Sequence, residues 1–181
     1  PGSVSFDLLA GSQRPSAEDG AQALRSALAG HDDTTGSIGA GVGACAGKIR
    51  GGVGSALVDV SPYTLAAVVV ANPVGQVIDS ATGRLFGAPD KPAVDVKRFA
   101  AAMSLAEAHL NTTIGAVLTD APLTKAQAKR LALAGHDGIA RAVRPAHSPL
   151  DGDTIFAAAT GRVGEASAST AETAPGVDAE V

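Results

Sequence analysis

A threonine that follows an asparagine stands where the chain changes from one pattern to another. Asn111 and Thr112 lie within LNTTIGAVLTDAPL. Residues 95–109 are alanine-rich and amphipathic, which predicts a helix, and residues 113–119 are β-branched and apolar, which predicts a strand. If the Asn111–Thr112 bond is cut, the new α-amine has an unperturbed pKa of ~8 and can act as the base for its own hydroxyl. A plain helix exit into a strand is the alternative interpretation.

Two carboxylates separated by one glycine precede another apolar strand pattern. Asp151, Gly152 and Asp153 predict a tight turn that leads into residues 154–160. Two carboxylates held close together do not both ionise cheaply, so one of them tends to keep a proton. Such a pair can orient a hydroxyl, accept its proton or protonate a leaving amine. An ordinary solvated turn is the alternative interpretation.

Two further polar residues end segments of small, apolar residues. Lys48 closes GSIGAGVGACAGK, and an inward-pointing ammonium at this position would need a carboxylate partner. Asn72 ends a predicted strand just before Pro73, so its side chain could shape a turn or donate to an oxyanion. Lys48 at the surface and Asn72 in a turn are the alternatives without a catalytic role.

The segment from Asn111 to Gly161 resembles the catalytic C-terminal segment of the L-aminopeptidase/D-esterase family of self-processing N-terminal-nucleophile hydrolases. This family includes β-aminopeptidases and the hydrolases of 6-aminohexanoate (nylon) oligomers. A weaker resemblance extends upstream through PGSVSFDLL, GSIGAGVGACAGK, GGVGSALV and VVVANPVGQVIDSATGR. Aminopeptidase members cleave before a serine and carry Ser-Gly-Glu, whereas this chain has Asn-Thr and Asp-Gly-Asp. That combination is more similar to the nylon-oligomer-hydrolase branch.

The resemblance implies self-cleavage between Asn111 and Thr112 and then hydrolysis of short ω-amino-acid oligomers or small peptides by a homo-oligomer, a tetramer in the family. A cut one residue later would make Thr113 the nucleophile. Other functions compatible with the resemblance are an aminopeptidase or D-amino-acid esterase, an acyltransferase of the ornithine-acetyltransferase type, and a non-catalytic scaffold. The catalytic residues that the resemblance implies are Thr112, Asp151, Asp153, Lys48 and Asn72.

Composition excludes several other classes of function. The net charge of −4 without a basic cluster argues against nucleic-acid binding. Apolar runs such as residues 65–71 have the length of a strand and are far too short to span a membrane. A single cysteine, Cys45, excludes an intrachain disulfide and a multi-cysteine metal site. With the four histidines scattered along the chain, we predict neither a metal nor a cofactor.

Familiar catalytic and nucleotide-binding motifs are also missing. The glycine-rich segment before Lys48 is not a phosphate-binding loop, because Val42 and Ile49 occupy the positions of an essential glycine and a magnesium-binding hydroxyl. Cys45 lies in an apolar segment that would not activate a thiol nucleophile. No G-x-S-x-G motif is present for a serine triad.

The remaining patterns predict how the chain is organised. We expect strands over residues 4–8 and 37–46, a hairpin of residues 53–60 and 64–72, and a loop over 80–92. Ser16 would cap a helix that ends near residue 28, and a Thr124/Gln127 capping box would open another that ends near residue 143. These elements indicate an α+β or α/β fold.

The resemblance narrows the fold to an α/β class, a four-layer α/β/β/α sandwich that cuts itself. Residues 1–111 and 112–161 would then be the larger-chain and catalytic smaller-chain portions of one domain, and residues 162–181 a loose tail or linker. Relative to the family, the chain lacks a sizeable N-terminal portion. No signal-like segment is present, so we expect a cytoplasmic protein.

Overall fold

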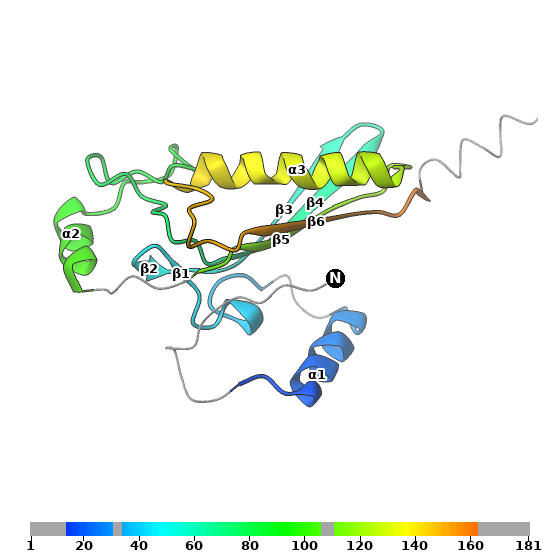
Figure 1. Cartoon of the computed structure of the whole chain (residues 1–181), viewed down its shortest axis with the longest axis horizontal. Coiled ribbons are helices and arrows are strands. Elements are labelled where there is room, and N and C mark those ends of the chain that lie inside the picture. Colours follow the sequence, from blue (N-terminus) through cyan, green and yellow to red (C-terminus); the bar gives the residue numbers. More distant parts are fainter. Residues whose placement is uncertain (1–13, 31–33, 106–110, 163–181) are drawn as a thin grey trace, which may run out of the picture.

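A four-stranded sheet lies at the centre of the computed structural model, which describes residues 14–30, 34–105 and 111–162. β3 pairs antiparallel with β4, and β4 with β5, whereas β5 and β6 run parallel. Parallel neighbours need a connection that crosses one face of the sheet, and α3 supplies it (Figure 1). In sheet order, the strands are β3 (Gly52–Val60), β4 (Tyr63–Ala71), β5 (Ile114–Thr119) and β6 (Thr154–Ala159).

The hairpin of β3 and β4 forms as predicted, with Ser61 and Pro62 as its two connecting residues. Pairing runs along both strands from Gly52 opposite Ala71 to Val60 opposite Tyr63. β3 is the first strand in the order of the sheet, and most of its residues are exposed. The second strand, β4, lies under α3, since alternate residues from Leu65 to Ala71 line the cavity beneath that helix.

Helix α3 (Lys125–Ala142) covers one face of the sheet and contacts β5 and β6 (Figure 1). It begins at the predicted capping box, in which Thr124 and Gln127 exchange side-chain and backbone hydrogen bonds. Gly135 lets it lie close to the sheet, because a Cβ atom there would be 2.8 Å from Ile155 Cγ2. A cavity of about 430 Å³, lined mainly by apolar side chains, remains between α3 and the sheet.

Short elements lie on the side of the sheet opposite α3 (Figure 1): α1 (Ala17–Leu28), the 3₁₀ turn η1 (Gly39–Gly41), β1 (Cys45–Ala46) and β2 (Ile49–Arg50). α1 begins after Ser16 as predicted, and hydrogen bonds from Ser16 lower the pKa of Asp19 in its first turn. The predicted strand over residues 37–46 is wrong for most of its length. Gly39 and Gly43 have φ angles of 47° and 80°, which turn the chain instead of extending it.

The segments around Asn111 follow the predicted order of helix and strand. α2 (Val96–Leu105) begins where Asp95 accepts hydrogen bonds from the amides of Lys97 and Arg98, and residues 106–109 of the predicted helix lie outside the described residues. β5 begins at Ile114, slightly later than predicted. Thr113 donates its amide to a side chain, so the ladder starts after it.

The expected α/β class is confirmed, since a mixed sheet packs against helices. The predicted strand at residues 4–8 and nearly all of the predicted tail, 163–181, lie outside the described residues. The division into residues 1–111, 112–161 and 162–181 stays a prediction.

Candidate active site

Two buried asparagine side chains connect the segments that meet just before the first residue of β5. Asn111 is 6% exposed, and its Nδ2 donates to Pro73 O at 2.9 Å and to Cys45 O at 3.3 Å. Asn72 is 1% exposed, and its Oδ1 accepts from the Cys45 amide at 2.8 Å. Buried amides that bind backbone groups in this way fix the path of the chain. The residue before Thr112 is thus held in place by its own side chain.

The peptide carbonyl of Asn111 is contacted from two directions. The Thr112 hydroxyl, Oγ1, donates to Asn111 O at 2.8 Å, and the Gly152 amide donates to the same oxygen at 3.1 Å. Asn111 and Asp151 form a parallel bridge, which aligns the two segments. A Cβ atom at Gly152 would lie only 2.8 Å from Thr112 Oγ1. The hydroxyl, the carbonyl beside it and a backbone donor therefore form one compact group.

Each of the two carboxylates has its own hydrogen-bond partners. Asp151 accepts from the Val74 amide at 2.8 Å through Oδ1, and from Ser148 Oγ at 2.8 Å and the Ser148 amide at 3.2 Å through Oδ2. The Asp153 side chain is 3% exposed. It accepts from the Thr113 amide at 2.9 Å through Oδ1. Asp153 thus binds the backbone next to the Asn111–Thr112 bond. Asp151 binds the backbone of Val74, in the segment that anchors Asn111.

Thr113 lies in different surroundings from Thr112. It is 3% exposed and lines the apolar cavity beneath α3, together with Val117 and Ile155. Its Oγ1 is buried and has no hydrogen-bond partner among the described residues. The Thr112 hydroxyl, by contrast, lies against the Asn111 carbonyl and Gly152.

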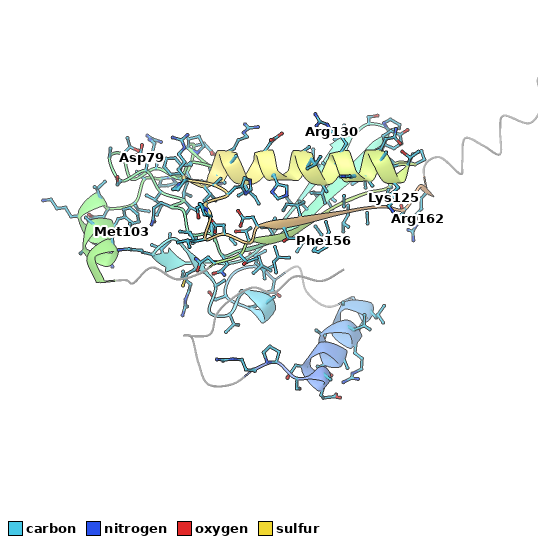
Figure 2. All side chains as sticks on the ribbon, viewed as in Figure 1. Asp79, Met103, Lys125, Arg130, Phe156 and Arg162 are labelled. Atoms are coloured by element: carbon cyan, nitrogen blue, oxygen red, sulfur yellow. The ribbon has the colours of Figure 1, made fainter. Side chains whose placement is uncertain are left out.

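Lys48 points towards α2. Its Nζ donates to the main-chain carbonyl of Met103 at 2.7 Å, and Figure 2 shows Met103 on α2 at one end of the molecule, far from Lys125 and Arg162. The partner is a carbonyl and not the carboxylate that we expected for an inward-pointing ammonium. The preceding residue, Gly47, donates its amide to Pro73 O at 2.8 Å. Because Pro73 O also accepts from Asn111, the backbone beside Lys48 joins the same hydrogen-bond network.

His147 belongs to this site although the sequence did not single it out. Its Nδ1 lies 2.9 Å from Asp153 Oδ2, and its ring packs edge-on against His136 of α3, with centroids 4.9 Å apart. The available signal was its position six residues before Asp153 and four before Asp151. That spacing predicts a contact only once the turn between them is known.

No group of three or more histidine, cysteine, aspartate or glutamate residues among the described residues could hold a metal ion. No helix in the same part of the chain is both long and apolar enough to cross a membrane. What the site contains is a hydroxyl, two acids, side-chain amides and backbone donors. These groups suit acyl transfer between oxygen and nitrogen.

The family model of Peptidase family S58 matches residues 5–179 of the sequence. An uncharacterized aminopeptidase of Mycobacterium leprae is 48% identical over 181 residues, which cover 90% of this chain and 49% of the relative. A 6-aminohexanoate-oligomer endohydrolase of Kocuria sp. is 32% identical over 142 residues, which cover 71% of this chain and 40% of the relative. The chain thus spans about half the length, or less, of these two relatives.

Solved structures are also similar to part of this chain. A protein from Pyrococcus horikoshii has a TM-score of 0.51 and 31% identity, over 71% of this chain and 33% of its own. An L-aminopeptidase D-Ala-esterase/amidase from Ochrobactrum anthropi, described as a variant of the Ntn hydrolase fold, has a TM-score of 0.48 and 27% identity, over 69% of this chain and 32% of its own.

Proposed function

Because this chain belongs to peptidase family S58, as its resemblance predicted, we propose that it is an amide hydrolase that cuts itself before Thr112 and then uses Thr112 as its nucleophile. The hydrogen bond of 2.8 Å from the Thr112 hydroxyl to Asn111 O carries the proposal. It keeps the hydroxyl next to the carbonyl carbon that it would attack, and such proximity removes much of the entropic cost of the reaction.

In the first reaction, Thr112 Oγ1 attacks the carbonyl carbon of Asn111. The C–N bond breaks, the hydroxyl proton passes to the Thr112 nitrogen, and an ester joins the two residues. Water then hydrolyses the ester to a carboxylate on Asn111, a free amine and a free hydroxyl on Thr112. The Gly152 amide, 3.1 Å from Asn111 O, supports this route because it donates to the oxygen on which negative charge develops.

In the second reaction, the new α-amine of Thr112 takes the hydroxyl proton as Oγ1 attacks a substrate amide. The leaving amine is protonated and departs, and water releases the acyl group from Thr112. Asp151 and Asp153 assist these proton transfers in the proposal. Asp153 also holds the amide next to the nucleophile, and Asp151 anchors the facing turn. Asn72 and Lys48 stabilise developing charge in this proposal. Asn72 would donate through Nδ2, because its Oδ1 accepts from the Cys45 amide.

We propose short amide substrates, either ω-amino-acid oligomers of the 6-aminohexanoate type or small peptides. The Asn-Thr and Asp-Gly-Asp residues support the oligomers, whereas the higher identity to the mycobacterial aminopeptidase supports peptides. Parallel assays with a 6-aminohexanoate trimer and with aminoacyl p-nitroanilides separate the two. Transfer of an acetyl group to added glutamate, in place of release to water, would indicate the acyltransferase. A homo-oligomer, a tetramer by resemblance, also remains a proposal.

The intact mass and N-terminal sequence of the purified protein test self-cleavage directly. We expect two chains, the smaller of which begins at Thr112. A new terminus at Thr113 would move the nucleophile into the apolar cavity and overturn the assignment. Active protein with an uncut chain would refute the mechanism as a whole.

Replacing Gly152 by alanine should slow self-cleavage while the chain still folds. The added Cβ would lie 2.8 Å from Thr112 Oγ1, so the hydroxyl must move away from the Asn111 carbonyl. A misplacement of about 1 Å at a reacting group can cost about 100-fold in rate. We would follow the conversion of full-length chain on denaturing gels.

Gly20→Ala is the matched control for this change. It adds the same methyl group on α1, where no atom lies within 4 Å of the new Cβ. The control should cut at the wild-type rate. If Gly152→Ala also cuts at the wild-type rate, the close approach of this turn to Thr112 has no part in the reaction.

A further inference from the structure

The carboxylate of Asp153 is almost fully withdrawn from solvent. Its side chain is 3% exposed, and its two oxygens bind different partners. Oδ1 accepts from the Thr113 amide, and Oδ2 lies 2.9 Å from His147 Nδ1. A buried carboxylate is costly unless its oxygens are hydrogen-bonded, so both contacts fix which way it faces. Without the contact to His147, the carboxylate could rotate away from the amide of Thr113.

The backbone of His147 is held in an unusual conformation that suits this contact. Its φ angle is 54°, in the left-handed region that residues other than glycine, asparagine, aspartate and histidine seldom adopt. The ring also packs edge-on against His136, which restricts its plane. In the tautomer that carries the proton on Nδ1, the ring donates this hydrogen bond and Asp153 Oδ2 accepts it. The backbone conformation of His147 and the packing of its ring against His136 therefore both restrict how the imidazole faces Asp153.

We propose that His147 is the positioning residue of the active site, and that it acts through Asp153. Its Nδ1–H holds Asp153 Oδ2, so that Oδ1 stays on the amide of Thr113, next to the nucleophile. The imidazole is 39% exposed, and its Nδ1 faces Asp153 Oδ2. Its role is to orient the carboxylate and the start of β5. This inference rests on the proposed function of Thr112.

Two substitutions separate the hydrogen bond from the backbone conformation. His147→Gly removes the side chain, and glycine adopts a φ of 54° without strain. His147→Asn keeps a donor at the position of Nδ1, and asparagine also tolerates the left-handed region. The glycine variant should cut itself and turn over substrate up to about 100-fold more slowly, as for other misplaced catalytic groups. The asparagine variant should recover most of both rates.

A double-mutant cycle with Asp153→Asn shows whether His147 works through that carboxylate. If it does, His147→Gly slows self-cleavage strongly in the wild-type background and only slightly once Asp153 has been changed. A general structural role of His147 would instead slow both backgrounds by the same factor. Equal factors would therefore overturn the proposal.

The amide resonance of Thr113, measured by NMR in ¹⁵N-labelled protein, reports the position of Asp153 without relying on activity. We expect it to shift in His147→Gly and to return towards the wild-type value in His147→Asn. An unchanged resonance in His147→Gly would overturn the positioning role, whatever the enzyme does. Wild-type protein that neither cuts itself nor hydrolyses amides would overturn the proposed function. The Thr113 resonance in His147→Gly tests the positioning role separately.

Discussion

Thr112→Ala should give a folded chain that stays uncut and hydrolyses no amide substrate. The change removes the hydroxyl that lies 2.8 Å from Asn111 O and leaves the Asn111 anchors to Pro73 and Cys45 in place. Loss of a catalytic nucleophile costs on the order of 10⁶-fold in turnover in other hydrolases, so activity should fall to background. Thr112→Ser should retain partial cleavage because it keeps the hydroxyl. Denaturing gels, intact mass and amide hydrolysis measure both variants.

Thr113→Val is the matched control for that experiment. It removes the neighbouring hydroxyl and keeps the shape of the side chain. Because the Thr113 hydroxyl is buried without a partner among the described residues, its loss should leave stability unchanged or raise it. We expect normal cleavage. If the valine variant stays uncut while Thr112→Ala is processed, the nucleophile has been assigned to the wrong threonine.

Asp151→Asn and Asp153→Asn should each lower turnover much more than stability. Both changes keep the size of the side chain but remove the negative charge and one acceptor oxygen. General acid–base assistance is worth about 10²–10⁴-fold in rate, and a loss of that order is expected. The lost acceptor should cost about 1–3 kcal/mol of unfolding free energy, because a partner of each acid loses a hydrogen bond. Amide hydrolysis rates and melting temperatures would be compared for the two variants.

Asp137→Asn supplies the control, since it makes the same chemical change at an exposed position of α3. It should leave both the rate and the melting temperature near wild type. Full activity in both turn variants would reduce the Asp-Gly-Asp segment to a structural turn. The candidate site would then shrink to Thr112 and the groups on the Asn111 carbonyl.

Features determined by nearby residues could be predicted from the sequence. The Ser16 cap and the Thr124/Gln127 capping box form where predicted, because each needs only residues within one helical turn. The β3–β4 hairpin forms for the same reason, since its strands are neighbours in the chain. The candidate nucleophile and the Asp-Gly-Asp turn were found through their positions at the starts of two strand patterns. Their adjacency follows from the parallel pairing of β5 with β6, which no local pattern specifies.

Features that depend on distant contacts could not be predicted in this way. The contact of Lys48 with a carbonyl on α2 joins residues that are 55 positions apart. The contact of His147 with Asp153 depends on a left-handed backbone angle that the histidine itself does not dictate. The glycines near residue 40 were consistent with a strand until their positive φ angles were known. In each case the deciding factor is the path of the chain and not the type of the residue.

The position of β5 in the sheet has a consequence for the lifetime of the cut protein. β5 lies between β4, which would belong to the larger chain, and β6, which would belong to the smaller one. Cleavage before Thr112 leaves these ladders intact but removes the covalent link between the two chains. Once such a protein unfolds, its halves diffuse apart, and reassembly requires a bimolecular encounter that becomes rare at low concentration. The persistence of the mature enzyme is then governed by how slowly it unfolds, and no longer by a folding equilibrium.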